Sequence, residues 1–452
     1  MLYQKQSDWQ LEIPAYGDGT LDPVLYSCGY AYYEGKDKSL MRQINETTAE
    51  AFTEYCRMLE EQGYQKTFGN EIDGNLYGAY TAPSGSRWYV YYLTADGKTG
   101  TARIIRESAD SAVLEDFCYE VEGDAEFYAF NLNTEADDTY LIRLSDNKWI
   151  VIDGGTTKWK TVDAEGQFAD SLYKFMRERS GLKDGDKLVI ASWYLTHGHR
   201  DHFMAFGAMI EQHHENIRLE RIIANIPDHD EIDHNSNLSD FRCTMEILQR
   251  HFPNVMYLKA HTGMKIQLAN VTISVLYTQE DHLDFWIKNK QLFWDKWKFY
   301  SSMDQDAPDY EECRQSCKVY DINNTSLNAL FFFDGITLLE LGDGFRWHEL
   351  MRPYYSDTTL LADIIKTAHH FNNEETVQSY CELCEYGRPV CLFIPSERIR
   401  KEQNEQKIRA ALKKDQKLIL ARCDKIMQFR RSGKEILVCD IPAAYSWRMA
   451  AQ

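Results

Sequence analysis

The segment SWYLTHGHRDHFMAF, residues 192–206, places four side chains of metal-binding types within six positions. It overlaps the end of the apolar run KLVIASWYLT, which follows KDGD and predicts a buried strand. The cluster therefore lies where a strand ends and a loop begins, the place where ligands gather in layered α/β proteins. Imidazole and carboxylate are common ligands of zinc, manganese and iron. We therefore interpret these residues as a metal site rather than a polar turn: His197, His199, Asp201 and His202.

The spacing of the four residues indicates two ions. Alternate residues of an extended chain point the same way, so His197 and His199 can chelate one ion. Asp201 and His202 follow in a turn and point elsewhere, which suits a second ion. Two ions about 3.5–4 Å apart can hold a hydroxide, which is a nucleophile at neutral pH.

The motif THGHRDH matches the signature H-x-H-x-D-H, and on this motif the chain resembles the metallo-β-lactamase superfamily of hydrolases. From about residue 124, the order strand, strand with IDGG, helix, strand and histidine cluster resembles the opening of that fold. The resemblance implies an α/β protein with a four-layer αββα sandwich. It also implies that Asp153 of IDGG lies near the metals, although a turn aspartate before two glycines explains the residue equally well.

A second ligand segment follows the runs SLNALFFF and ITLLEL, which predict a hairpin closed at Asp334-Gly335. This hairpin delivers Gly342-Asp343 at a strand end. The resemblance implies that Asp343 bridges both metals, and two cations that close need an anion between them. The resemblance assigns a catalytic role to two residues, Asp201 and Asp343.

The segment LLADIIKTAHHFNN ends in two histidines and resembles the HHG segment that supplies the last histidine of the second metal. Position favours His369 as this ligand and leaves His370 open. Phe371 stands where the family often has glycine, so the shape of this loop departs from the family pattern.

One ligand of the first metal stays open. Many family members supply a further histidine between the cluster and the bridging aspartate. His229 and His234 could do so here, Asn323 or Asn324 could contribute, or water could fill the position.

The order N-N-x-S, G-D, H-H and a late strand pair is closest to the hydrolase domain attached to competence-type DNA-uptake channels, and to its soluble relatives. This resemblance runs from about residue 124 to 441. An aromatic-rich insertion at about 278–320 interrupts it. We expect the insertion to be a lid or wall over the site, or else an extra helix packed on the core.

Residues 1–122 predict a small α+β domain that precedes a hydrolase domain at 123–452. Thr47 and Glu50 form a capping box before an amphipathic helix that ends at Gly63. Aromatic and β-branched runs then predict a meander of strands. We expect this domain to serve packing, recognition or dimerisation, so oligomerisation through it is one possible partnership.

The composition narrows the choice of partners. The formal net charge of −20 repels nucleic acid and anionic membranes. No stretch approaches the roughly 20 apolar residues of a membrane span, and the first residues lack a signal-peptide pattern. The 11 scattered cysteines fit reduced thiols and a cytoplasmic location.

These features predict a metal-dependent hydrolase that uses a hydroxide bound by two divalent ions. Zinc is the default ion, and manganese or iron also suit such mixed ligands. A small phosphoester or another anionic ester is the expected substrate. The alternatives are a lactone or thioester hydrolase, and a sensor or scaffold in which the metal domain is purely structural.

Overall fold

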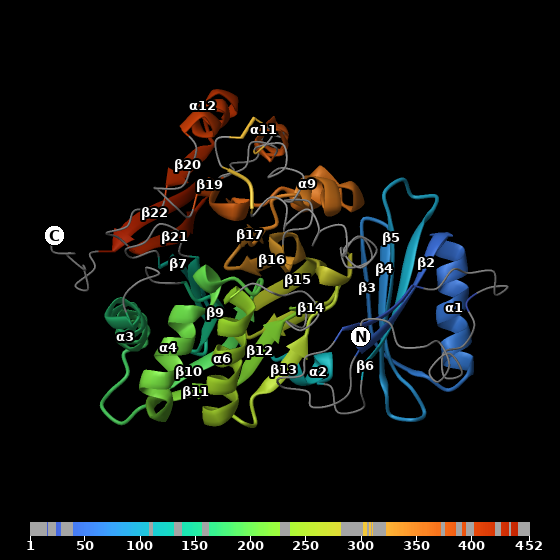
Figure 1. Cartoon of the computed structure of the whole chain (residues 1–452), viewed down its shortest axis with the longest axis horizontal. Helices are drawn as coiled ribbons and strands as arrows, with labels where there is room; N and C mark the ends of the chain where they lie inside the picture. Colours follow the sequence, from blue (N-terminus) through green and yellow to red (C-terminus); the bar gives the residue numbers. More distant parts are fainter. Residues whose placement is uncertain are drawn as a thin grey trace.

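The structure is a computed structural model (Figure 1). In the part of the chain that it describes, every helix is too short or too polar to cross a lipid bilayer. The described residues are 16, 24–28, 39–107, 112–130, 138–155, 162–226, 236–281, 302–304, 307–308, 310, 322–371, 376–385, 391–394, 402–420, 426–433 and 435–441.

The first sheet is antiparallel throughout, and its order is β1-β2-β6-β5-β4-β3. Helix α1 (Ala49–Glu61) covers its outer face, where the aromatic rings of Phe52 and Tyr55 are buried (Figure 1). The strands are β1 (Val24–Cys28), β2 (Ser39–Thr47), β3 (Gln65–Ile72), β4 (Asn75–Thr81), β5 (Arg87–Thr94) and β6 (Gly100–Glu107).

The start of α1 differs from the prediction by one residue. The N-cap is Thr48, whose hydroxyl accepts a hydrogen bond from the backbone N–H of Ala51. Thr47 is instead the last residue of β2, and its hydroxyl lies 2.9 Å from the hydroxyl of Tyr16. The capping box with Thr47 was therefore wrong, because the strand extends to that residue.

The second sheet has four neighbouring parallel strands, β13, β12, β10 and β9, followed by antiparallel ones. Helices α3 (Val162–Arg179), α4 (Met204–His213) and α6 (Ser236–His251) lie side by side along it (Figure 1). Its strands are β7 (Glu126–Ala129), β8 (Thr139–Arg143), β9 (Trp149–Asp153), β10 (Leu188–Leu195), β11 (Ile217–Leu219), β12 (Arg221–Ala224), β13 (Met256–Lys259), β21 (Ile426–Ser432) and β22 (Glu435–Ile441).

The third sheet begins antiparallel and becomes parallel after β17. Its strands are β14 (Lys265–Leu268), β15 (Val271–Tyr277), β16 (Asn328–Phe333), β17 (Ile336–Glu340), β18 (Ile364–Lys366), β19 (Cys391–Ile394) and β20 (Lys417–Leu420). The remaining helical segments are α2 (Leu114–Phe117), α9 (Trp347–Leu350), α10 (Asp357–Leu360), α11 (Val377–Glu385), α12 (Glu402–Ala411), η1 (Arg200–His202), η2 (His214–Asn216), η3 (Ile322–Thr325), η4 (Arg352–Tyr354) and η5 (Ala368–Phe371).

Buried side chains join the second and third sheets. The ring centroids of Phe127 and Phe333 lie 5.6 Å apart, and those of Tyr194 and Phe331 lie 5.0 Å apart. Each pair takes one ring from each sheet, so the two sheets share one apolar core. The prediction of a mixed α/β chain is confirmed, as is the hairpin closed by the turn at Asp334.

The first sheet packs onto this same core through its inner face. Tyr77 and Tyr89 belong to the buried cluster that also contains Met264 and Ile266. Gly263 has a φ of +90°, and a Cβ there would lie 1.8 Å from the ring of Tyr77. This close approach requires glycine at residue 263. The domain boundary between residues 122 and 123 stays a prediction.

Buried charges also join the first sheet to the rest. The imidazole of His261 lies between two carboxylates, with Nδ1 2.8 Å from Glu280 and Nε2 3.0 Å from Glu107 of β6. Asp281 accepts a hydrogen bond from the hydroxyl of Tyr91 and pairs with Arg103. The predicted insertion at about 278–320 begins here, but most of it lies outside the described residues.

Candidate metal centre

The candidate ligands lie at one edge of the second and third sheets, because several strands end there. Strand β9 ends at Asp153, and β10 is followed by His197. Strand β17 leads into Asp343, and β18 leads into His370. Strand β8 runs antiparallel to β9, so Asp138, which precedes β8, lies at the same edge. Segments far apart in the sequence therefore bring their polar side chains together.

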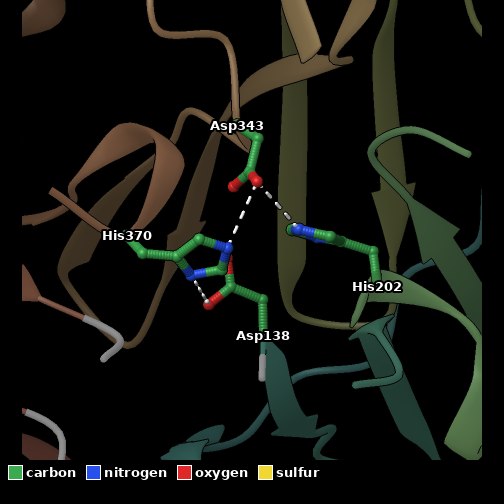
Figure 2. Close-up of side chains that lie close together, drawn as sticks. All are labelled: Asp138, His202, Asp343 and His370. Atoms are coloured by element: carbon green, nitrogen blue, oxygen red, sulfur yellow. Dashed lines mark ion pairs between the residues drawn. The ribbon is translucent and has the colours of Figure 1, made fainter. Parts of the chain in front are cut away.

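Four side chains at this edge form a group that could hold a metal ion: Asp138, His202, Asp343 and His370 (Figure 2). Their ligand atoms all lie within 4.8 Å of one another. Oδ2 of Asp343 is 3.3 Å from Nε2 of His202 and 3.2 Å from Nε2 of His370. Asp138 lies on the other side of the His370 ring, with Oδ1 3.8 Å from Nδ1. All four residues are buried.

Asp201 extends this group toward solvent. Its Oδ2 lies 3.2 Å from Nε2 of His370 and 3.9 Å from Nε2 of His202. Its side chain is 26% exposed, whereas the two histidines are almost fully buried. Asp201 is therefore the open side of the group. Burial raises the pKa of its carboxyl, but His202 and His370 outweigh burial and lower it.

His197 and His199 lie beside this group. The ring centroid of His197 is 4.8 Å from that of His199 and 4.2 Å from that of His202. His197 is fully buried, and among the described residues its Nε2 has no hydrogen-bond partner. Burial, together with His202 and His199, holds the pKa of His197 well below its usual range. A neutral imidazole with an open nitrogen is a metal-ligand form of histidine.

The structure brings His370 to the carboxylates of Asp201 and Asp343. The ring of His369 lies 5.3 Å from that of Phe345, and its backbone N–H donates to the carbonyl of Gly342. His369, His370 and Phe371 have φ angles of 47°, 52° and 61°. This left-handed run is unusual for side chains other than glycine.

Asp153 contacts the histidine cluster and does more than close a turn. Its Oδ2 lies 2.6 Å from Nδ1 of His202, and its Oδ1 accepts the backbone N–H of Thr196 at 2.8 Å. The hydroxyl of Thr196 donates to Oδ2 at 2.8 Å. These contacts fix the ring of His202 and leave its Nε2 directed at Asp343.

Sequence reasoning missed three charged residues of this edge: Asp138, Glu340 and Lys366. Nζ of Lys366 lies 2.5 Å from Oδ2 of Asp138 and 3.5 Å from Oδ1 of Asp343. Oε1 of Glu340 accepts the backbone N–H of Gly342. For two of them the sequence offered a signal, which was a charged residue inside an apolar run: Glu340 in ITLLEL and Lys366 in ADIIKTA. Lysine and glutamate are almost never fully buried without a partner.

The charges of the group are strongly coupled. Burial alone would lower the pKa of His202, but Asp343, Asp153 and Asp201 raise it well above its usual value. Asp343 and Asp138 likewise overcome burial and raise the pKa of His370 to about 10. Burial raises the pKa of Asp343, yet His370 and His202 bring it well below its usual range. The carboxylates therefore attract positive charge to both imidazoles.

Two of the other candidates for the first metal, Asn323 and Asn324, lie in η3. The side-chain oxygen of Asn324 accepts the backbone N–H of Arg346 at 3.2 Å. The carbonyl of Asn323 accepts from Ser326. These contacts hold loops. His229 and His234 lie outside the described residues.

Comparison with known proteins identifies part of this arrangement. Residues 134–254 match the family model of the metallo-beta-lactamase superfamily. The metallo-beta-lactamase segment covers about a quarter of the chain and includes Asp138, Asp153 and the histidine cluster. Asp343, Lys366 and His370 lie beyond the matched residues. No curated protein matches the chain.

The donor set, of which Asp201 and His202 lie within the metallo-beta-lactamase segment, fits a metal ion. The measured separations between Asp201 or Asp343 oxygens and the two Nε2 atoms run from 3.2 to 3.9 Å. Ligands about 2.1 Å from a tetrahedral zinc ion are separated by roughly 3.4 Å. Nε2 of His202 lacks a hydrogen-bond partner among the described residues, as expected of a ligand atom. The nitrogen and oxygen donors suit zinc, manganese or iron.

Proposed function

We propose that the chain is a metal-dependent hydrolase with two divalent ions. One observation carries this proposal: two imidazole Nε2 atoms and two carboxylate Oδ2 atoms face one another at separations suited to a metal ion. The metallo-beta-lactamase segment supports hydrolysis as the reaction type.

The proposed second ion is held by Asp201, His202, His370 and Asp343. His197 and His199 are proposed to hold the first ion, with Asp343 between the two ions. The open Nε2 of the buried His197 supports the first site. His370 takes the place expected for His369, because its Nε2 lies 3.2 Å from both Asp201 and Asp343.

When bound, divalent ions supply an activated water and a Lewis acid for a carbonyl or phosphoryl oxygen. The protein's own contribution is to fix the ligands. Asp153 holds the ring of His202 through Nδ1, and the hydroxyl of Ser326 accepts the backbone N–H of Asp343 at 3.1 Å. Asp201, which is the exposed ligand, lies where a substrate can approach.

The charge of the group supports the binding of divalent cations. Burial raises the pKa of Glu340 to about 8, so this carboxyl is largely neutral at pH 7. Four carboxylates then lie at this edge together with the ammonium of Lys366 and the imidazoles of His202 and His370, whose pKa values the carboxylates raise. Divalent ions that replace the protons of the two imidazoles would offset these carboxylates. The four carboxylates are Asp138, Asp153, Asp201 and Asp343.

The proposed substrate is a small phosphoester or another small anionic ester. The resemblance to the competence-type hydrolase branch favours phosphoesters, and the net charge of −20 disfavours polymeric nucleic acid. A lactone or thioester hydrolase is the second enzymatic candidate. Zinc is the proposed ion, with manganese or iron as alternatives.

The proposal extends to the fold and the cell compartment. The shared core of the second and third sheets, with α3, α4 and α6 on one side, supports the four-layer αββα sandwich. Free thiols such as those of Cys384 and Cys391 support a cytoplasmic location.

The test is metal analysis of the purified protein, followed by removal of metal with a chelator and reconstitution with Zn²⁺, Mn²⁺ or Fe²⁺. Phosphodiester, phosphomonoester, lactone and thioester substrates are then assayed. We expect two ions per chain and turnover that disappears with the chelator and returns with the metal. Tight binding without turnover on any substrate would favour a sensor or scaffold, and absence of both would refute the metal site.

A further inference from the structure

The proposed ligands belong to two groups that come from different sheets. His197, His199, Asp201 and His202 follow β10 of the second sheet. Asp343 and His370 follow β17 and β18 of the third sheet. An ion held by both groups needs a fixed gap between these two sheet edges.

A buried ion pair crosses this gap. Lys366 is the last residue of β18, and its Nζ lies 2.5 Å from Oδ2 of Asp138, which precedes β8 of the second sheet. Both side chains have almost no exposed surface. At this depth a charge-assisted contact is strong, and neither charge has solvent as an alternative partner.

Each end of the pair continues to a proposed ligand. On the third sheet, Nζ of Lys366 donates to the carbonyl of Gly342 at 2.5 Å and lies 3.5 Å from Oδ1 of Asp343. On the second sheet, the backbone N–H of Asp138 donates to the carbonyl of Asp201 at 3.4 Å. Oδ1 of Asp138 also faces Nδ1 of His370. The pair therefore touches ligands on both sides of the gap.

We propose that Lys366 is a positioning residue, which acts through Asp138 to set the distance between the two ligand groups. This inference rests on the proposed metal site and adds a role that the ligands themselves do not have. Lys366 does not contact the substrate. Its ammonium holds Asp343 and the strand end that precedes His370 at a fixed separation from Asp201.

A simple counter-charge role predicts the opposite sign for a lysine variant. If Lys366 only neutralised carboxylates, Lys366→Met would leave the site more negative and would strengthen the binding of a divalent cation. If Lys366 positions ligands, the same variant weakens the second ion, which takes ligands from both groups, more than it weakens the first. Residues that support metal ligands typically contribute 10–100-fold in metal affinity, and we expect a loss in that range.

The experiment measures stepwise binding of Zn²⁺ and Co²⁺ to the chelator-treated full-length protein. We compare the wild type, Lys366→Met, Asp138→Asn and the double variant. Each single substitution breaks the same link, so the loss in the double variant should equal the larger single loss rather than the sum. Asp138→Asn keeps an acceptor for the hydroxyl of Tyr140, and it carries the test if Lys366→Met does not fold.

Lys148→Met is the matched control. Nζ of Lys148 also bridges two carboxylates, at 3.2 Å from Asp146 and 3.3 Å from Glu220, but at the opposite end of β9. We expect it to leave both ion affinities unchanged. If the wild type binds no ion, the proposed function and the role of Lys366 both fail. If the wild type binds two ions and the Lys366 and Asp138 variants bind both equally well or more tightly, only the role of Lys366 is refuted.

Discussion

Nδ1 of His202 lies 2.6 Å from Oδ2 of Asp153, and both side chains are completely buried. Asp153 holds this position with a φ of 56°, in the left-handed region that a side chain other than glycine rarely adopts. Such conformations persist where the surroundings over-determine them, often at functional sites. Here the backbone N–H and the hydroxyl of Thr196 hold the carboxylate in place.

Asp153→Asn should weaken the ion held by His202 by about 10–100-fold, because a neutral amide no longer fixes and polarises the imidazole. Stepwise Co²⁺ titration followed by absorption measures this loss. Asp146→Asn, at the opposite end of β9, should change the affinity little. Equal losses in the two variants would contradict the specific role of Asp153.

Asp343 and Asp334 are both aspartates next to glycine, but their surroundings are opposite. Asp343 is buried against His202 and His370, whereas Asp334 is exposed in the turn between β16 and β17. Asp343→Asn should abolish hydrolysis and weaken the second ion by more than about 100-fold, since an amide cannot offset two dications. Asp334→Asn should leave both properties almost unchanged, because Asn-Gly suits the same turn. Comparable loss of activity in both variants would remove Asp343 as the bridging ligand.

The variants His370→Gln and His369→Gln should show which of the two neighbouring histidines binds the second ion. We expect loss of the second ion in His370→Gln, because its Nε2 lies 3.2 Å from both Asp201 and Asp343. His369→Gln should change the affinity by no more than about threefold, as for a residue outside the ligand set. Elemental analysis after gel filtration gives the stoichiometry. One remaining ion in His369→Gln and two in His370→Gln would reverse the assignment.

His261 should make stability depend on pH. Burial lowers its pKa, but Glu280 and Glu107 outweigh burial and raise the pKa above the ordinary 6.5. The protonated ring therefore stabilises the fold fully below pH 6.5, and this contribution is lost as the pH rises through the folded-state pKa. Urea unfolding from about pH 6 to about pH 9 should show this decline.

The control for this prediction is His261→Gln. This variant should be less stable by about 1–3 kcal/mol at the low end of the range, since two buried carboxylates lose a charged partner. It should also lose less stability than the wild type as the pH rises. Parallel pH profiles for the two proteins would assign the decline to other groups.

The sequence predicted those parts of the fold that depend on local pattern. The run KLVIASWYLT forms β10, and the turn at Asp334 joins β16 to β17, because apolar runs and turn residues act over a few positions. The sequence placed the N-cap of α1 at Thr47, and the structure has it at Thr48. Both threonines can cap a helix, and only the strand pairing of Thr47 distinguishes them.

Long-range features of the candidate site could not be predicted in this way. Lys366 and Asp138 meet only because β18 and β8 belong to sheets that face each other. His370 lies beside the carboxylates within a left-handed run from His369 to Phe371. A pattern of residue types contains neither the sheet pairing nor these backbone angles.

The shared core beneath the first sheet has a practical consequence for anyone who wishes to shorten this protein. Cutting the chain near residue 122 would remove the rings of Tyr77 and Tyr89 from the buried cluster that also contains Met264 and Ile266. It would also remove Glu107, which is one of the two carboxylates that contact His261. Apolar surface newly exposed to water promotes aggregation. A fragment that begins near residue 123 should therefore precipitate on expression, because the first sheet is a permanent part of the shared core.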